Sequence, residues 1–231
     1  MIGRIDVPGL NPDAILYGPV FKRVYTFNGR SRDVTVIDAV GLRVLSTIAL
    51  GGKPEVAVTD GAGHIFVNLE DTAEIVMIDE ATSQVRSRWP LAPCAEPTGL
   101  AIDAEHRRLF SVCANQTMVV LDATTGRLVA QVQIGDAPDG AGFDAALGLV
   151  FSANGDGSLT VVHEDGPDRY AVVATVATQK RARTMSLDPA THRIYLVSAD
   201  FGAAPQPTPA DRKPRAPMLA RTFTVLVVAP R

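Results

Sequence analysis

Acidic side chains recur at one position of a sequence repeat. This position lies five residues before a recurring aspartate, whose place is taken by Gly18 in the first repeat. In the five repeats the position holds Asp13, Glu55, Thr98, Asp139 and Arg183. Hard cations such as Ca²⁺, Mg²⁺ and Mn²⁺ prefer oxygen ligands, and carboxylates that converge without a partner repel one another. The pattern therefore indicates either a divalent-metal or small-ligand site, or a solvated group of acids that meet water and Arg183.

Amides and further charged side chains are expected near these acids, because they follow the second strand of each repeat. They are Asn28, Asn68, Asn115 and Asn154, with Arg30, Glu70, Asp71 and Asp156 close by and Glu96 just before Pro97. We predict the metal ligands Asp13, Glu55, Asp139 and Asn154, and the ligand contacts Asn28, Arg30, Glu96 and Asn154.

A metal at this place could polarise a carbonyl or phosphoryl oxygen and activate water. Asp13 or Asp139 would then act as general base, and Arg183 would pair with an anionic substrate or developing oxyanion. This chemistry predicts a hydrolase of lactone, ester or phosphoester bonds. The alternative is a binding scaffold without catalysis, and no G-x-S-x-G nucleophile motif is present.

The elements that position these residues come from a repeat with a period near 42 residues. Its most regular feature is an aromatic residue in each second strand, at Tyr25, Phe66, Phe110, Phe151 and Tyr195. Four short strands in each period predict an all-β protein, a β-propeller of five four-stranded blades. We place the blades at about 11–51, 52–94, 95–136, 137–179 and 180–231 of a single domain.

The fifth repeat ends after its third strand, at "FTVLVV". The segment "IGRIDVPG" alternates apolar and polar residues before the first repeat, as an outer strand does. We therefore predict that strand 2–7 completes blade five, either within the chain or in another copy. Blade edges left exposed predict a homo-oligomer.

With the repeats placed, the chain resembles the YVTN-type (YncE-like) propeller family. The motifs that carry the resemblance are "NPDAILY", "TVIDA", "GGKPE", "APCAEPTGLAID" and "DPATHRIYLVSADFG". The resemblance implies a secreted or periplasmic propeller of seven blades. The chain as it stands lacks two of these blades and a signal peptide, which predicts a cytoplasmic protein.

Charge is spread unevenly along the chain. Residues 179–231 hold nine Lys and Arg against three Asp and Glu, in a chain whose net charge is −3. The Pro-rich loop 202–221 falls in this part and could fold over the acidic residues as a lid. The basic sector consists of Lys180, Arg181, Arg183, Arg212, Lys213, Arg215 and Arg221. It allows non-specific nucleic-acid binding, although a solvated basic face is favoured because few aromatic residues accompany it.

Cysteines and histidines give weaker signals. Cys94 and Cys113 belong to one blade and form either a disulfide or two small buried thiols. The four histidines lie in or beside the turns at the other end of the blades from the acidic residues. They are spread over four blades, so a His-rich zinc site is not expected. No apolar run reaches the length of a membrane span, and a membrane partner is not expected.

Overall fold

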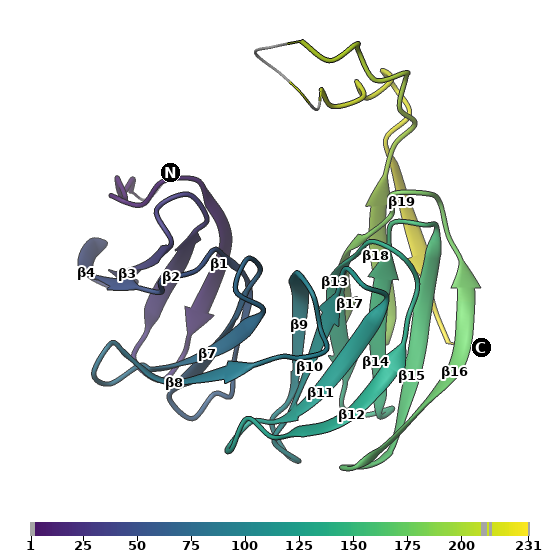
Figure 1. The fold of residues 1–231 in the computed structure, drawn as a ribbon. Helices are drawn as coiled ribbons and strands as arrows, with labels where there is room; N and C mark the ends of the chain where they lie inside the picture. Colours follow the sequence, from purple (N-terminus) through teal and green to yellow (C-terminus); the bar gives the residue numbers. More distant parts are fainter. Residues whose placement is uncertain (1–2, 209–211, 213, 231) are drawn as a thin grey trace.

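The computed structural model describes residues 3–208, 212 and 214–230 and is all-β (Figure 1). Its strands form a β-propeller of five antiparallel blades set in a ring around a common axis, which confirms the predicted fold class. Within the described residues, no helix is long and apolar enough to cross a membrane.

The strands of each blade pair in chain order. Blade one contains β1 (Pro12–Gly18), β2 (Arg23–Asn28), β3 (Asp33–Asp38) and β4 (Arg43–Ala49). Blade two contains β5 (Pro54–Thr59), β6 (His64–Leu69), β7 (Glu74–Asp79) and β8 (Gln84–Pro90). Blade three contains β9 (Pro97–Asp103), β10 (Arg108–Cys113), β11 (Thr117–Asp122) and β12 (Leu128–Gln133). Blade four contains β13 (Pro138–Asp144), β14 (Leu149–Asn154), β15 (Ser158–Gly166) and β16 (Arg169–Ala177). Blade five contains β17 (Thr184–Asp188), β18 (Arg193–Ser198) and β19 (Thr224–Val228), and its described residues supply no fourth strand.

Aspartates at the ends of third strands close the turns toward the outer strands. The Oδ1 atom of Asp38 accepts hydrogen bonds from the backbone N–H groups of Val40 at 3.0 Å and Gly41 at 2.9 Å. These bonds hold the pKa of Asp38 below its usual value. Asp79 accepts the equivalent bond from Thr82 at 2.8 Å. A single residue type thus sets where a blade turns back.

The core lies between the blades. Tyr25 and Phe27 of blade one are fully buried against blade two, and the outer strand of blade one adds Ile48 to the same cluster. Between blades three and four, Phe110 packs against Phe143 with ring centroids 5.4 Å apart. Each blade is therefore stabilised mainly by burying its apolar faces against its neighbours.

The ring has an open sector between blades five and one. The inner strands pack side by side in the order β1, β5, β9, β13, β17, and among the described residues no comparable packing joins β17 to β1 (Figure 1). Blade one consequently presents one face, and blade five the opposite face, toward this sector.

The segment before β1 stays with blade one. Residues 3–8 form no strand, Gly3 lies against Leu42, and Gly9 lies against Asn28. The prediction that strand 2–7 completes blade five within the chain is therefore wrong for residues 3–7, and Ile2 lies outside the described residues. The open sector explains the difference, because it separates the segment before β1 from β19 of blade five (Figure 1).

The described part of the Pro-rich loop 202–221 projects away from the body of the propeller beyond blade five (Figure 1). Its two arms meet where Phe201 forms a β-bridge with Met218 and the Gly202 N–H donates to the Pro217 carbonyl at 2.9 Å. The described part of the loop therefore does not cover the inner strands as a lid. Residues 209–211 and 213, including Lys213 of the basic sector, lie outside the described residues.

Cys94 and Cys113 form a disulfide, with Cα atoms 5.5 Å apart, which decides between the two alternatives for these residues. It ties the loop that enters blade three to the end of β10. Both residues belong to the apolar cluster between blades two and three.

Removing this disulfide should destabilise blade three. The bond closes a loop with a sequence separation of 19 residues. For a loop of this size, cross-linking lowers the entropy of the unfolded chain by an amount worth about 3 kcal/mol. We expect the double variant Cys94→Ala/Cys113→Ala to lose about that much unfolding free energy in urea denaturation, whereas unchanged stability would contradict this role.

Candidate metal centre

The acids predicted from the repeat occupy equivalent places at the starts of inner strands. Asp13, Glu55 and Asp139 each lie in a β-bulge, where the register with the second strand shifts. Bulges re-aim side chains, so the shared irregularity explains why these positions stand out in the sequence.

Two of these three acids have a basic partner nearby. The Glu55 carboxylate lies 2.6 Å from the Lys53 ammonium, which also pairs with Glu70. The Asp139 carboxylate lies 3.7 Å from Arg183 and accepts a 3.3 Å hydrogen bond from Thr184. Asp13 is exposed. The three acids do not come together as one group of ligand atoms within 4.8 Å in the described structure.

The predicted amide ligands are occupied within their own blades. Asn28 is fully buried, and its amide donates to Asp33 at 2.7 Å and to Thr35 at 3.0 Å. Asn154 is also fully buried and donates to Ser158 and Thr160, each at 3.0 Å. Both asparagines therefore join the second strand to the third. Arg30 and Glu96 are exposed.

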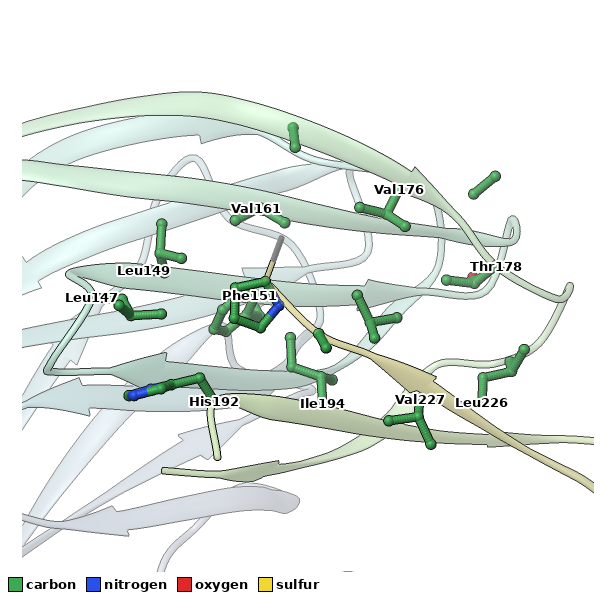
Figure 2. Close-up of a pocket in the computed structure, with 15 residues that line it drawn as sticks. Leu147, Leu149, Phe151, Val161, Val176, Thr178, His192, Ile194, Leu226 and Val227 are labelled. Carbon is green, nitrogen blue, oxygen red and sulfur yellow. The ribbon is translucent and has the colours of Figure 1, made fainter. Parts of the chain in front are cut away.

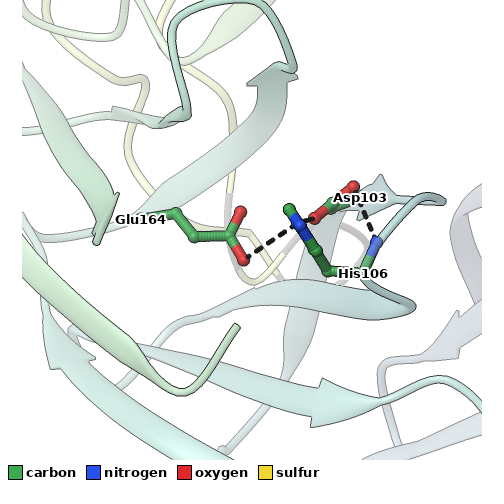
Figure 3. Close-up of side chains that lie close together, drawn as sticks. All are labelled: Asp103, His106 and Glu164. Carbon is green, nitrogen blue, oxygen red and sulfur yellow. Dashed lines mark hydrogen bonds and ion pairs between the residues drawn. The ribbon is translucent and has the colours of Figure 1, made fainter. Parts of the chain in front are cut away.

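A different group of ligating side chains lies on the opposite side of the blades, where two blades meet (Figure 3). Asp103 ends β9 and His106 follows in the next turn, both in blade three, and Glu164 comes from β15 of blade four. One ligand atom from each lies within 4.8 Å of the others, so this group could hold a metal ion. It is the one such group in the described part of the chain.

The geometry within the group is tight. His106 Nδ1 lies 2.6 Å from Asp103 Oδ2 and 3.9 Å from Glu164 Oε1. The other carboxylate oxygen of Asp103 accepts the backbone N–H of Glu105 at 3.0 Å, which fixes the Asp103 rotamer. The side chains of Asp103 and Glu164 are 3 % and 4 % exposed, whereas that of His106 is 47 % exposed. Two buried carboxylates thus meet one imidazole that is open to solvent.

Burial and mutual repulsion set the protonation of the group. Burial raises the pKa of Glu164, and the charge of Asp103 raises it further. The hydrogen bond and the negative charge of Asp103 raise the pKa of His106. The group therefore favours bound protons, which a cation would replace.

Neighbouring side chains hold the two halves in place. The Tyr170 hydroxyl lies 3.2 Å from Glu164 Oε1. Arg108 of blade three donates to the Pro167 carbonyl of blade four at 2.6 Å and to Asp168 at 3.1 Å. Such outer contacts orient ligand side chains and keep the two blades in register.

Equivalent places between other blades carry only part of this group. Glu80 of blade two matches Glu164, since both backbone N–H groups bond the turn after an inner strand, but Glu80 faces Gly18, where an aspartate would stand. Between blades two and three, Asp60 and His64 pair at 2.7 Å. There Ala123 takes the place of the glutamate, and Ala123, Asp60 and His64 line a cavity of about 420 Å³.

The sequence held a signal for this group that the repeat alignment did not use. Aspartate followed by histidine three or four residues later occurs after the inner strands of blades two, three and five. Glutamate at the Glu80 and Glu164 position alternates with alanine. Only the structure shows that this glutamate faces the Asp–His turn of the preceding blade.

Two side chains of the basic sector have partners. Arg183 pairs with Asp139, and the Arg181 guanidinium lies over the Phe201 ring at 4.2 Å from its centroid. Nucleic-acid binding by this sector stays a prediction.

No family model matches the chain, and no curated protein matches its sequence. Its fold is similar to that of a solved chain of hydrazine synthase from Kuenenia stuttgartiensis, with a TM-score of 0.77 at 14% sequence identity. The similarity covers 100% of this chain and 66% of the other, so this chain spans about two thirds of that length. The 1473 solved chains that match show how widespread the fold is, so the fold does not identify the function. The propeller is thereby confirmed, and membership of the YVTN-type family stays a prediction.

The raised pKa of Glu164 predicts a pH-dependent stability in metal-free buffer. Because its pKa is higher folded than unfolded, its contribution is complete below the unfolded pKa of about 4.3 and is lost as pH rises through the folded pKa. Wild type should therefore lose unfolding free energy relative to Glu164→Gln as the pH increases toward neutrality. Urea denaturation at several pH values measures this.

Glu105→Gln is the matched control, because Glu105 is exposed in the same turn. Its difference from wild type should change less with pH than that of Glu164→Gln. Equal changes in the two variants, or a constant difference for Glu164→Gln, would contradict the assigned protonation of the group.

Proposed function

We propose that this protein is a propeller that binds a divalent transition-metal ion between blades three and four, through Asp103, His106 and Glu164. The supporting observation is the placement of one imidazole nitrogen and two carboxylate oxygens within 4.8 Å of one another. The ion would join two blades at a point where buried carboxylates otherwise repel.

The donor set suggests the kind of ion. One imidazole with two carboxylates suits Mn²⁺, Zn²⁺ or Fe²⁺ better than an all-oxygen Ca²⁺ site, which needs six to eight ligands. Mn²⁺ was also among the ions predicted from the sequence. Three protein ligands leave at least one further position for water or a small ligand, and the exposed side of His106 gives solvent access.

The arrangement of this site supports a metal-binding role before a catalytic one. Bound metal would replace protons on His106 and Glu164, while Tyr170 would orient the glutamate and Arg108 would hold the blades together. We include in the same proposal a small ligand that completes the coordination. It is either water or an anion, because a Lewis acid binds both.

Metal binding should raise the melting temperature of the protein. An ion that binds only the folded state at 100 times its Kd adds about 2.7 kcal/mol of stability. We expect Mn²⁺ or Zn²⁺ at one ion per chain, with binding lost in His106→Asn and Asp103→Asn. Calorimetric titration and thermal unfolding, each with a chelator reference, measure both quantities.

His64→Asn is the matched control, because His64 makes the same contact with Asp60 where no glutamate completes the group. It should bind the ion as wild type does. Equal losses in His64→Asn and His106→Asn, or no ion bound by wild type, would contradict the proposal.

A gain of binding gives a second test. Ala123→Glu would place a carboxylate beside Asp60 and His64, in a cavity of about 420 Å³ that can accept it. The expected result is a second ion per chain. If Ala123→Glu folds and the stoichiometry stays at one, the three-ligand account of the site fails.

A further inference from the structure

Blade five leaves an unpaired edge beside a cavity. A cavity of about 620 Å³ runs between β16 and β19 and is lined mainly by apolar side chains, among them Val176, Leu226 and Val228 (Figure 2). Thr178 also lines it, and its buried hydroxyl has no hydrogen-bond partner among the described residues. Along this edge the backbone groups of β19 meet no fourth strand from the described part of the chain.

The other blades show what fills such a space. Outer strand β8 supplies Val85 to the cluster with the preceding blade. Outer strand β16 supplies Tyr170, whose ring lies 5.7 Å from that of Phe110 in blade three. Blade five has no equivalent in its described residues, so the cavity marks the place of an absent outer strand.

Apolar faces border the open sector on both sides. On blade five, Val225 and Val227 are 52 % and 54 % exposed, on the face that points away from blade four. On blade one, Ile15 and Tyr17 are 73 % and 51 % exposed, on the face that points away from blade two. The positions equivalent to Val225 and Val227 in blade one, Val34 and Val36, are fully buried against blade two.

The segment before β1 already lies on blade one as an outer strand lies on the blade that follows it. The Leu10 N–H donates to Ser31 at 2.9 Å, and at the same place before blade four the Asp136 N–H donates to Asp156 at 2.8 Å. Ile5 and Val7 are half-buried, whereas Arg4 and Asp6 are exposed. The segment thus alternates half-buried apolar and exposed charged side chains, as an outer strand does, and it pairs with no strand among the described residues.

We propose that copies of this chain associate head to tail, with residues 3–7 of one copy pairing as the outer strand along β19 of the next. The connection from that strand into β1 then repeats the connection from β4 into β5. Blade one of one copy thereby packs on blade five of the next, as consecutive blades do within the chain. The arrangement covers Val225, Val227, Ile15 and Tyr17 and closes the edge of β19.

We assign a second copy of the chain to this place because one contact between copies would cover both the edge of β19 and the exposed faces of blades one and five. An unrelated strand would cover the edge of β19 but leave the faces of blades one and five exposed. The contact is heterologous, since it joins two different surfaces, so it builds either a closed ring of copies or a filament.

Light scattering during size-exclusion chromatography of the full chain tests this. Wild type should give a particle larger than 24.5 kDa whose mass rises with concentration. Val225→Glu and Ile15→Glu each change one exposed side chain on one side of the contact, so each variant alone should run as a monomer. Val173→Glu, on β16 with 56 % exposure, is the matched control and should assemble as wild type does.

Mixing the two monomeric variants separates this contact from a symmetric one. Val225→Glu keeps an intact blade-one face, and Ile15→Glu keeps an intact blade-five face. An equimolar mixture should therefore form a one-to-one dimer of twice the monomer mass. A wild-type monomer at every concentration would overturn the proposal, and so would variants that assemble alone or a mixture that stays monomeric.

Discussion

The structure depends on the burial of each blade's two apolar faces against its neighbours. A single four-stranded sheet with apolar residues on both sides is not stable in water, and the blade-to-blade clusters solve this for four interfaces. The same constraint brings residues about sixty positions apart into contact, as Asp103 and Glu164 show. It also explains why apolar side chains stay exposed at the open sector, where blades one and five each have a face without a neighbouring blade.

Buried charge is arranged along the same interfaces. At the blade-one interface, Glu80 is fully buried, and burial together with Glu80 raises the pKa of Tyr25 to about 12. At the last interface, His192 of blade five lies 2.7 Å from the buried Asp144 of blade four. Each interface thus carries its own pairing of acid with imidazole, hydroxyl or guanidinium. Among the described residues, two carboxylates and one histidine come together only between blades three and four.

The sequence predicted the elements well and their contacts poorly. The aromatic period and the turn aspartates determine the five blades, because they follow from local strand and turn preferences. Asn28 and Asn154 recur as ligands would, and in the structure each joins the second strand of its blade to the third. Glu164 and His106 were not linked in the sequence analysis, because pairing across an interface depends on the angle between blades. The place of residues 3–7 depended on the open sector, which the repeat pattern does not encode.

The central claim is that Asp103, His106 and Glu164 hold one metal ion. The most direct measurement is an anomalous-difference map from crystals grown with Mn²⁺ or Zn²⁺, collected at the absorption edge of the ion. The account predicts one peak within bonding distance of His106 Nδ1 and of the Asp103 and Glu164 carboxylates. A peak at Asp13, Glu55 and Asp139 instead, or no peak between blades three and four, would contradict it.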